Sequence, residues 1–169
     1  DSDYDHRMFT VNAGKWLTLK YLSLKNGKTS NDNYGGFILN NGGTVTIYNS
    51  ALSNGGSWKG AIYNETGGTL NIYNTWFTSL MAAGNINGKG GAIYNKGTVN
   101  LTESFLSNCF ADTFGGAIYN EGTLSADSTA FKSNGSEDSG GGGAIYNAEG
   151  ATATIINSTF TENTSVSHG

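Results

Sequence analysis

The most informative absences in this 169-residue sequence are proline, a second cysteine and long apolar runs. Without proline, every backbone N–H can donate a hydrogen bond, which suits a protein built from paired strands. Cys109 is the only cysteine, so an internal disulfide and a thiolate metal cluster are both excluded, and we interpret it as a small buried side chain. No stretch approaches the ~18 consecutive apolar residues of a membrane-spanning helix, so we expect a chain that is not embedded in a membrane.

Charge is also scarce. Only 13% of the residues are charged and the net charge is −4. A nucleic-acid-binding surface needs a basic patch or stripe, so we expect no nucleic-acid partner. A disordered chain normally carries more charge or proline, and fewer aromatic residues than the 12% found here. The composition therefore indicates an ordered, turn-rich β protein.

What the sequence does contain is a repeated hexapeptide. Gly-Gly-Ala-Ile-Tyr-Asn occurs at residues 90–95, 115–120 and 142–147, and weaker copies lie at residues 35–40 and 60–64. The isoleucines of the five copies are 24 to 31 residues apart. A period of this length is typical of a solenoid built from stacked coils.

Apolar residues recur in phase with this hexapeptide. After each copy comes a turn and then a run of alternating apolar and polar residues, which is typical of a strand with one buried face. Because equivalent residues of stacked coils lie above one another, we expect four apolar columns inside the coil. The predicted columns are Leu17/Val45/Leu70/Val99/Leu124/Ala153, Leu19/Ile47/Ile72/Leu101/Ala126/Ile155, Leu24/Leu52/Phe77/Phe105/Phe131/Phe160 and Ile38/Ile62/Ile93/Ile118/Ile145. The asparagine that ends each hexapeptide should stack in the same way and hydrogen-bond from coil to coil.

These patterns predict an all-β fold, a right-handed single-stranded parallel β-helix of about six coils. The handedness follows from the crossover rule for parallel strands. We treat residues 1–169 as one β-helix domain, with a leading segment at 1–8, repeats at 9–163 and a tail at 164–169. Because the sequence does not begin with methionine, we expect it to be a fragment of a longer protein.

The repeat also resembles those of known surface proteins. Besides the hexapeptide, a Phe-x-x-Asn tetrapeptide occurs at residues 105–108, 131–134 and 160–163. The pair of motifs resembles the repeats of chlamydial polymorphic outer-membrane proteins and, more strongly, the adhesin-like surface proteins of methanogenic archaea, over about residues 9–163. The resemblance implies a secreted, extracellular or cell-surface location and a non-catalytic role in cell adhesion or as a surface stalk. It implies no catalytic residue and no cofactor, and its implied partner is a protein or glycan on a host or neighbouring cell.

Two alternative functions remain open. Many β-helix proteins are polysaccharide lyases or hydrolases, whose sites need acidic residues gathered on one outer face. The 13 acidic residues here are scattered along the chain, which favours a protein that is not an enzyme and holds no metal. The second alternative is a subunit of an extracellular filament stacked head to tail, because both ends of such a coil expose unpaired strand edges.

A row of tyrosines is the candidate binding site. If Ile93 points inward, strand alternation turns its neighbours Ala92 and Tyr94 outward. Equivalent tyrosines should then form an external stack of rings, with Leu39 extending the stack and Trp58 and the segment around Met81 at its border. The candidate residues of this aromatic strip are Tyr63, Tyr94, Tyr119, Tyr146 and Trp58. An exposed apolar row with a polar rim often marks a contact site for a glycan or a protein, although a ladder that only stabilises the sheet is the simpler interpretation.

Charged residues follow the motif asparagine in three successive coils. They are Glu65, Lys96 and Glu121, and the repeat places them in one column on the outside of the coil. Opposite charges on neighbouring strands attract. We therefore predict a stack of alternating charge, one strand spacing apart.

Overall fold

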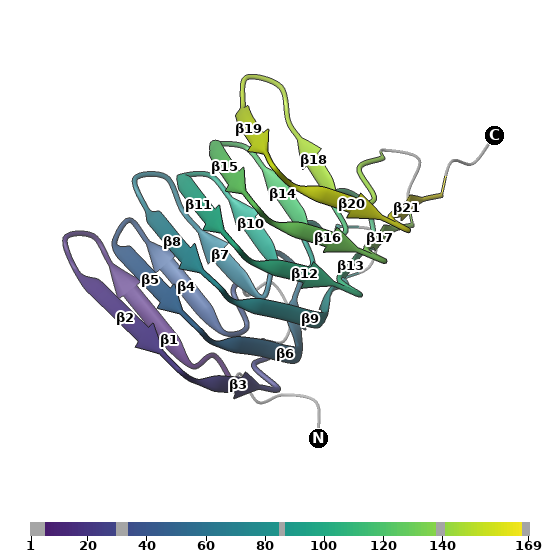
Figure 1. Cartoon of the computed structure of the whole chain (residues 1–169). Helices are drawn as coiled ribbons and strands as arrows, with labels where there is room; N and C mark the ends of the chain where they lie inside the picture. The colour runs from purple at the N-terminus through teal and green to yellow at the C-terminus, as the bar shows by residue number, and fades with distance from the viewer. Residues whose placement is uncertain (1–5, 30–33, 85–86, 138–140, 167–169) are drawn as a thin grey trace.

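The computed structural model describes residues 6–29, 34–84, 87–137 and 141–166, and these form a coil of short parallel strands (Figure 1). Every pairing between named strands is parallel, which confirms the predicted parallel β-helix. The coil has three faces, each formed by one sheet. From β1 to β18 the chain makes five turns, and β19 to β21 continue into the next turn.

The first sheet contains the motif strands. In spatial order these are β1 (Phe9–Asn12), β4 (Ile38–Asn41), β7 (Ile62–Asn64), β10 (Ile93–Asn95), β14 (Ile118–Asn120) and β18 (Ile145–Asn147). The second sheet follows the turn after the motif. Its strands are β2 (Trp16–Lys20), β5 (Thr44–Tyr48), β8 (Thr69–Tyr73), β11 (Thr98–Thr102), β15 (Thr123–Asp127) and β19 (Thr152–Ile156).

The third sheet closes each coil and leads back to the first. It comprises β3 (Ser23–Lys25), β6 (Ala51–Ser57), β9 (Trp76–Ala82), β12 (Phe105–Ser107), β13 (Phe110–Ala111), β16 (Ala130–Lys132), β17 (Gly135–Ser136), β20 (Thr159–Thr161) and β21 (Thr164–Ser165). The two longest strands, β6 and β9, pair over six positions. Both continue through a bend at which Asn54 and Ser79 have φ of 55° and 54°.

The motif glycines are required by the corner that precedes the first sheet. Gly90 and Gly115 have φ of 64° and 66°, which L side chains rarely adopt. The second glycine of each pair faces a different constraint, because a Cβ on Gly116 would lie 2.2 Å from the Gly143 carbonyl oxygen of the next coil. One glycine therefore permits the turn and the other permits the close stacking of coils.

Three of the four predicted interior columns are confirmed residue for residue. The pairings join both columns of the second sheet and the isoleucine column of the first sheet as predicted. Most of these side chains are fully buried in one core. Ala92 was predicted to face outward, which is wrong, because it belongs to this core together with Ala61 and Ala117. The strand begins only at the isoleucine, so strand alternation does not extend back to the alanine.

The third-sheet column differs from the prediction at one place. Leu106, and not Phe105, pairs with Phe77 on one side and Phe131 on the other, and Leu106 is buried. Phe105 faces outward, where its ring lies 5.3 Å from the ring of Trp76. The structural counterpart of Phe-x-x-Asn in this coil is therefore Leu-x-x-Cys, ending at Cys109. The Cys109 side chain is buried, as predicted, and burial raises the pKa of its thiol to about 12.

The motif asparagines form the predicted ladder inside the coil. The Nδ2 of each asparagine donates to the Oδ1 of the asparagine in the next coil, at 2.7 Å from Asn40, 2.8 Å from Asn64, 2.7 Å from Asn95 and 2.6 Å from Asn120. These four residues are fully buried. The same side chains also bond the adjoining turn, so that Asn95 Oδ1 accepts from the Gly97 N–H at 3.0 Å. Each amide thus holds one turn closed and joins two coils.

A second internal ladder consists of hydroxyl groups at the corner between the second and third sheets. Each hydroxyl donates to the carbonyl two residues before it, as Ser104 does to Thr102 at 2.9 Å. The hydroxyls of Ser50, Ser104 and Ser158 also accept a backbone N–H from the coil before them. The ladder residues are Ser50, Thr75, Ser104, Thr129 and Ser158. Two polar ladders and four apolar columns therefore run through the coil.

Candidate functional site

The tyrosine stack is present on the outside of the first sheet. Ring centroids are 5.0 Å apart between Tyr63 and Tyr94, 4.9 Å between Tyr94 and Tyr119, and 5.4 Å between Tyr119 and Tyr146. Leu39 pairs with Tyr63 and packs against the same cluster, as predicted. The sequence thus correctly predicted which residues stack.

The stack is not an exposed strip, however, and that part of the prediction is wrong. The side chains of Tyr63, Tyr94 and Tyr119 are only 2%, 3% and 6% exposed. Tyr34 and Phe114, from the segments that precede the motif, pack against the rings, with centroid distances of 4.8 Å from Tyr34 to Tyr63 and 4.6 Å from Phe114 to Tyr146. The rings therefore form a second apolar cluster outside the coil, covered by the chain itself.

Two lysines complete this cover. Lys59 Nζ lies 4.6 Å from the ring centroid of Tyr34, and Lys89 Nζ lies 4.7 Å from that of Tyr119. Backbone bridges place Lys59, Lys89 and Phe114 at equivalent positions of successive coils. Because ammonium groups are attracted to the faces of aromatic rings, the two lysine side chains lie across the stack.

The charged column lies beside the tyrosines and is hydrogen-bonded to them. Tyr63 Oη donates to Glu65 at 3.2 Å and Tyr94 Oη donates to Glu121 at 2.9 Å, while Lys96 Nζ lies 3.6 Å from Glu65. The backbone N–H of each charged residue bonds the motif asparagine of the coil before it, which confirms that the three are stacked. The carboxylates are therefore part of the scaffold.

The pKa values of these groups reflect burial and hydrogen bonding. Burial raises the pKa of the Tyr63 and Tyr119 hydroxyls to about 12. Burial and the hydrogen bond to Glu121 also raise the pKa of Tyr94. Burial alone would raise the pKa of Glu65, but the Thr66 N–H and the charge of Lys96 outweigh it, so that this pKa lies below its usual value. Glu65 thus stays ionised around neutral pH.

Reversing the central charge of the column tests this arrangement. We expect Lys96→Glu to lower the melting temperature at low salt, because it replaces the ion pair with three adjacent carboxylates. The partly exposed pair should contribute less than about 1 kcal/mol, and added salt should reduce the difference. Lys132→Glu is the matched control, since Lys132 is 4.0 Å from Glu162 and both side chains are more exposed. Equal effects of the two substitutions at low salt would contradict the stacked column.

Trp58 lies outside the tyrosine cluster and lines a hollow of its own. This hollow, which we call the Trp58 hollow, has a volume of about 490 Å³. It lies where β6 and β9 pair beyond their bends, and Met81 borders it. Its lining residues are Lys28, Thr29, Asn54, Gly55, Gly56, Ser57, Trp58, Ser79, Met81 and Ala83. Of the predicted binding residues, Trp58 is thus the one that lines an open hollow.

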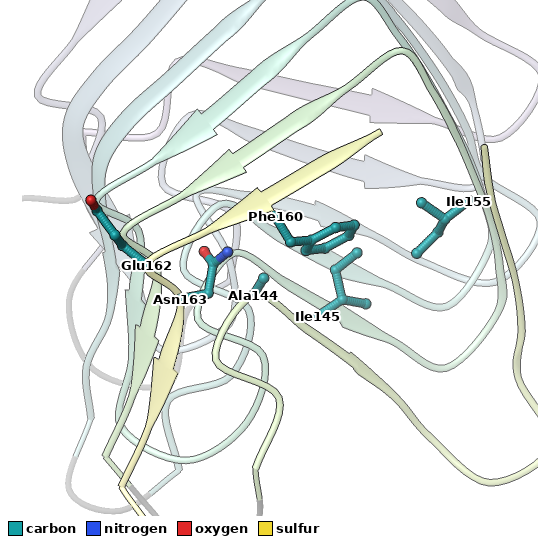
Figure 2. Close-up of a pocket in the computed structure, with 6 residues that line it drawn as sticks. All are labelled: Ala144, Ile145, Ile155, Phe160, Glu162 and Asn163. Carbon is teal, nitrogen blue, oxygen red and sulfur yellow. The ribbon is translucent and has the colours of Figure 1, made fainter. Parts of the chain in front are cut away.

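A second hollow lies at the C-terminal end of the coil. Figure 2 shows Phe160, Ile145 and Ile155 pointing toward one another there, with Glu162 directed away from them. Phe160 is 46% exposed, whereas Phe131 directly below it is 1% exposed. The hollow is therefore the uncovered end of the apolar columns.

Comparisons with protein-family models, curated proteins and solved structures give no significant match. The described residues include no helix with the length and hydrophobicity of a membrane span. In the same part of the chain, no three His, Cys, Asp or Glu side chains come together as a group that could hold a metal ion.

Proposed function

We propose that this chain is a non-catalytic cell-surface module that mediates attachment, with the coil as a rigid stalk. The observation that carries the proposal is how the repeat uses its polar groups. The motif asparagines and the corner hydroxyls are bonded inside the coil, and the tyrosines and carboxylates of the first sheet are bonded to one another. Recognition is then left to the parts of the coil that differ from one repeat to the next, such as the region of β6 and β9 where the Trp58 hollow lies. The surface location follows from the resemblance of the motifs.

The carboxylates argue against the alternative of a carbohydrate-active enzyme. A general acid in glycoside hydrolysis needs a raised pKa, so that it is protonated when it meets the substrate. The pKa of Glu65 is lowered, and Glu121 accepts a hydrogen bond from a tyrosine that is itself covered. Neither carboxylate is placed to transfer a proton to a bound sugar.

End-to-end self-association of the coils is a second candidate function. Stacking a second copy would cover Phe160, Ile155 and Ile145. The asparagine ladder would nevertheless break at each junction, because the first coil has Val11 at the position equivalent to Asn40. Sedimentation over a range of concentrations distinguishes a monomer from such a filament.

Attachment can be tested with beads that carry the purified chain. We expect saturable binding to microbial or epithelial cells that free chain competes away, and no new reducing ends when the chain is incubated with polysaccharides. Beads coated with albumin give the background. Cleavage of a polysaccharide by the purified chain would overturn the proposal in favour of an enzyme, and failure to bind any cell type would remove its basis.

A further inference from the structure

The Trp58 hollow lies over a column of the third sheet in which one position is glycine. Backbone pairing aligns Lys28, Gly56 and Met81 in successive coils. Gly56 is buried, and a Cβ on it would lie 1.9 Å from the Met81 carbonyl oxygen, so glycine permits the two coils to stack closely here. The bends at Asn54 and Ser79 place two exposed polar side chains at the edge of the hollow.

The indole of Trp58 is held in place before any ligand arrives. The backbone of Gly84 lies so close to the ring that a Cβ there would be 2.4 Å from its nearest atom. The Trp58 carbonyl accepts the Lys89 N–H at 3.2 Å, and the neighbouring Ser57 hydroxyl donates to the Gly60 carbonyl at 2.7 Å. The indole is half-buried, with Gly84 against it and the hollow beside it. A side chain fixed in this way loses little freedom on binding.

The chemistry of the lining restricts the class of ligand. The apolar surface comes from Trp58 and from Met81, whose side chain is 52% exposed. The polar rim consists of the Asn54 amide, the Ser79 hydroxyl and the Lys28 ammonium, and the lining includes no carboxylate. A pyranose ring matches this combination, because its C–H face packs on an aromatic ring while its hydroxyls bond groups at the edge.

We propose that the Trp58 hollow binds a pyranose unit of a surface polysaccharide, with the ring stacked on Trp58 and its hydroxyls bonded to Asn54 and Ser79. Lys28 adds an attraction for sugars that carry a carboxylate. This inference rests on the proposed attachment function, for which it names the ligand class. A hollow of this volume is within the range of small-ligand sites, roughly 300–1,000 Å³.

The inference is tested with an array of neutral, N-acetylated and uronate-containing oligosaccharides, followed by calorimetric titration of the best-bound one. We expect Trp58→Ala to weaken binding about tenfold or more and Trp58→Phe to retain most of it. Trp16→Ala is the matched control, because Trp16 is 80% exposed on β2 and should leave binding unchanged. A second variant, Asn54→Gly with Ser79→Gly, suits the positive φ at both positions and should reduce affinity several-fold with an intact fold.

The outcomes separate this inference from the proposed function. If the wild-type chain binds no saccharide, or if Trp58→Ala binds as well as wild type while retaining its melting temperature, the inference is wrong. Attachment of beads to cells in that case would leave the attachment function standing, with a protein as its ligand. Loss of saccharide binding in both Trp58→Ala and the double glycine variant supports the hollow as the site.

Discussion

Replacing Asn95 with aspartate should destabilise the protein severely, although the two side chains have the same shape. Asn95 Nδ2 donates to Asn120 Oδ1 at 2.7 Å, to the Thr123 carbonyl at 3.0 Å and to the Gly97 carbonyl at 3.2 Å. A carboxylate would present an oxygen to three acceptors in a fully buried site. Breaking a buried, hydrogen-bonded group in this way typically costs about 3–5 kcal/mol. Chemical unfolding of the variant at neutral pH measures the loss.

The matched control for this substitution is Asn71→Asp on the outer face of the second sheet. Asn71 Oδ1 accepts the Asn100 amide at 2.9 Å, a role that a carboxylate also fills, so its cost should be below about 0.5 kcal/mol. The deficit of Asn95→Asp should shrink at pH 4, because a protonated carboxyl can again donate to Asn120. Equal losses in the two variants would show that the ladder contributes no more than a surface amide.

The protein should also lose stability steeply above pH 10. An unfolded tyrosine titrates near pH 10, whereas Tyr63 and Tyr119 titrate in the folded protein with a pKa of about 12. Because the folded pKa is the higher one, this stabilisation is complete below pH 10 and is lost as the pH rises through 12. A pKa that is two units higher in the folded protein corresponds to at most about 2.7 kcal/mol in the free energy of unfolding for each tyrosine. Tyr94, whose pKa is also raised, adds to the loss. Urea unfolding at a series of alkaline pH values measures the slope of the free energy of unfolding against pH.

Two substitutions identify the groups responsible for this alkaline loss. Tyr94→Phe should flatten the slope, since phenylalanine has no proton to lose, at a cost of about 1 kcal/mol at pH 8 for the missing hydrogen bond to Glu121. Tyr21→Phe is the matched control, because it removes a hydroxyl that is 78% exposed and lies outside the stack. Near-ultraviolet titration that finds Tyr94 ionising near pH 10, as an unfolded tyrosine does, would contradict the covered stack.

The fold was predictable because each interior position recurs as an apolar residue in several repeats of the sequence. Leu70, Val99 and Leu124 have the same place in the alternation of apolar and polar residues in three repeats. Such a recurrence rarely arises by chance, so it predicts that these residues pair between neighbouring strands. The asparagine ladder was predictable for the same reason. The error at Phe105 arose where two apolar residues are adjacent, since a shift of one residue exchanges the two faces of a strand.

A signal that would have corrected Phe105 is present in the sequence. In four other coils a serine or threonine of the hydroxyl ladder stands two residues before the interior residue, as Thr75 does before Phe77 and Thr129 before Phe131. Ser104 stands two residues before Leu106. Using this offset would have placed Leu106 inside the coil and Phe105 outside.

The cover over the tyrosine stack was less predictable. It comes from Tyr34, Lys59, Lys89 and Phe114, in segments of different length that follow no common pattern. Their equivalence depends on backbone bridges between coils, which the sequence alone does not show. The site prediction was therefore right about stacking and wrong about exposure.

The stacking of coils also determines how the molecule responds to force. The ladders and sheet hydrogen bonds join each coil only to its two neighbours, so tension applied to the chain ends loads the outermost coil first. We therefore expect the coils to unfold one after another and not in a single step. At about 3.5 Å per extended residue, a coil of 24 to 31 residues lengthens the tether by roughly 80–110 Å. We expect a coil of this construction to lengthen in steps under tension, while the coils beyond the break keep their structure.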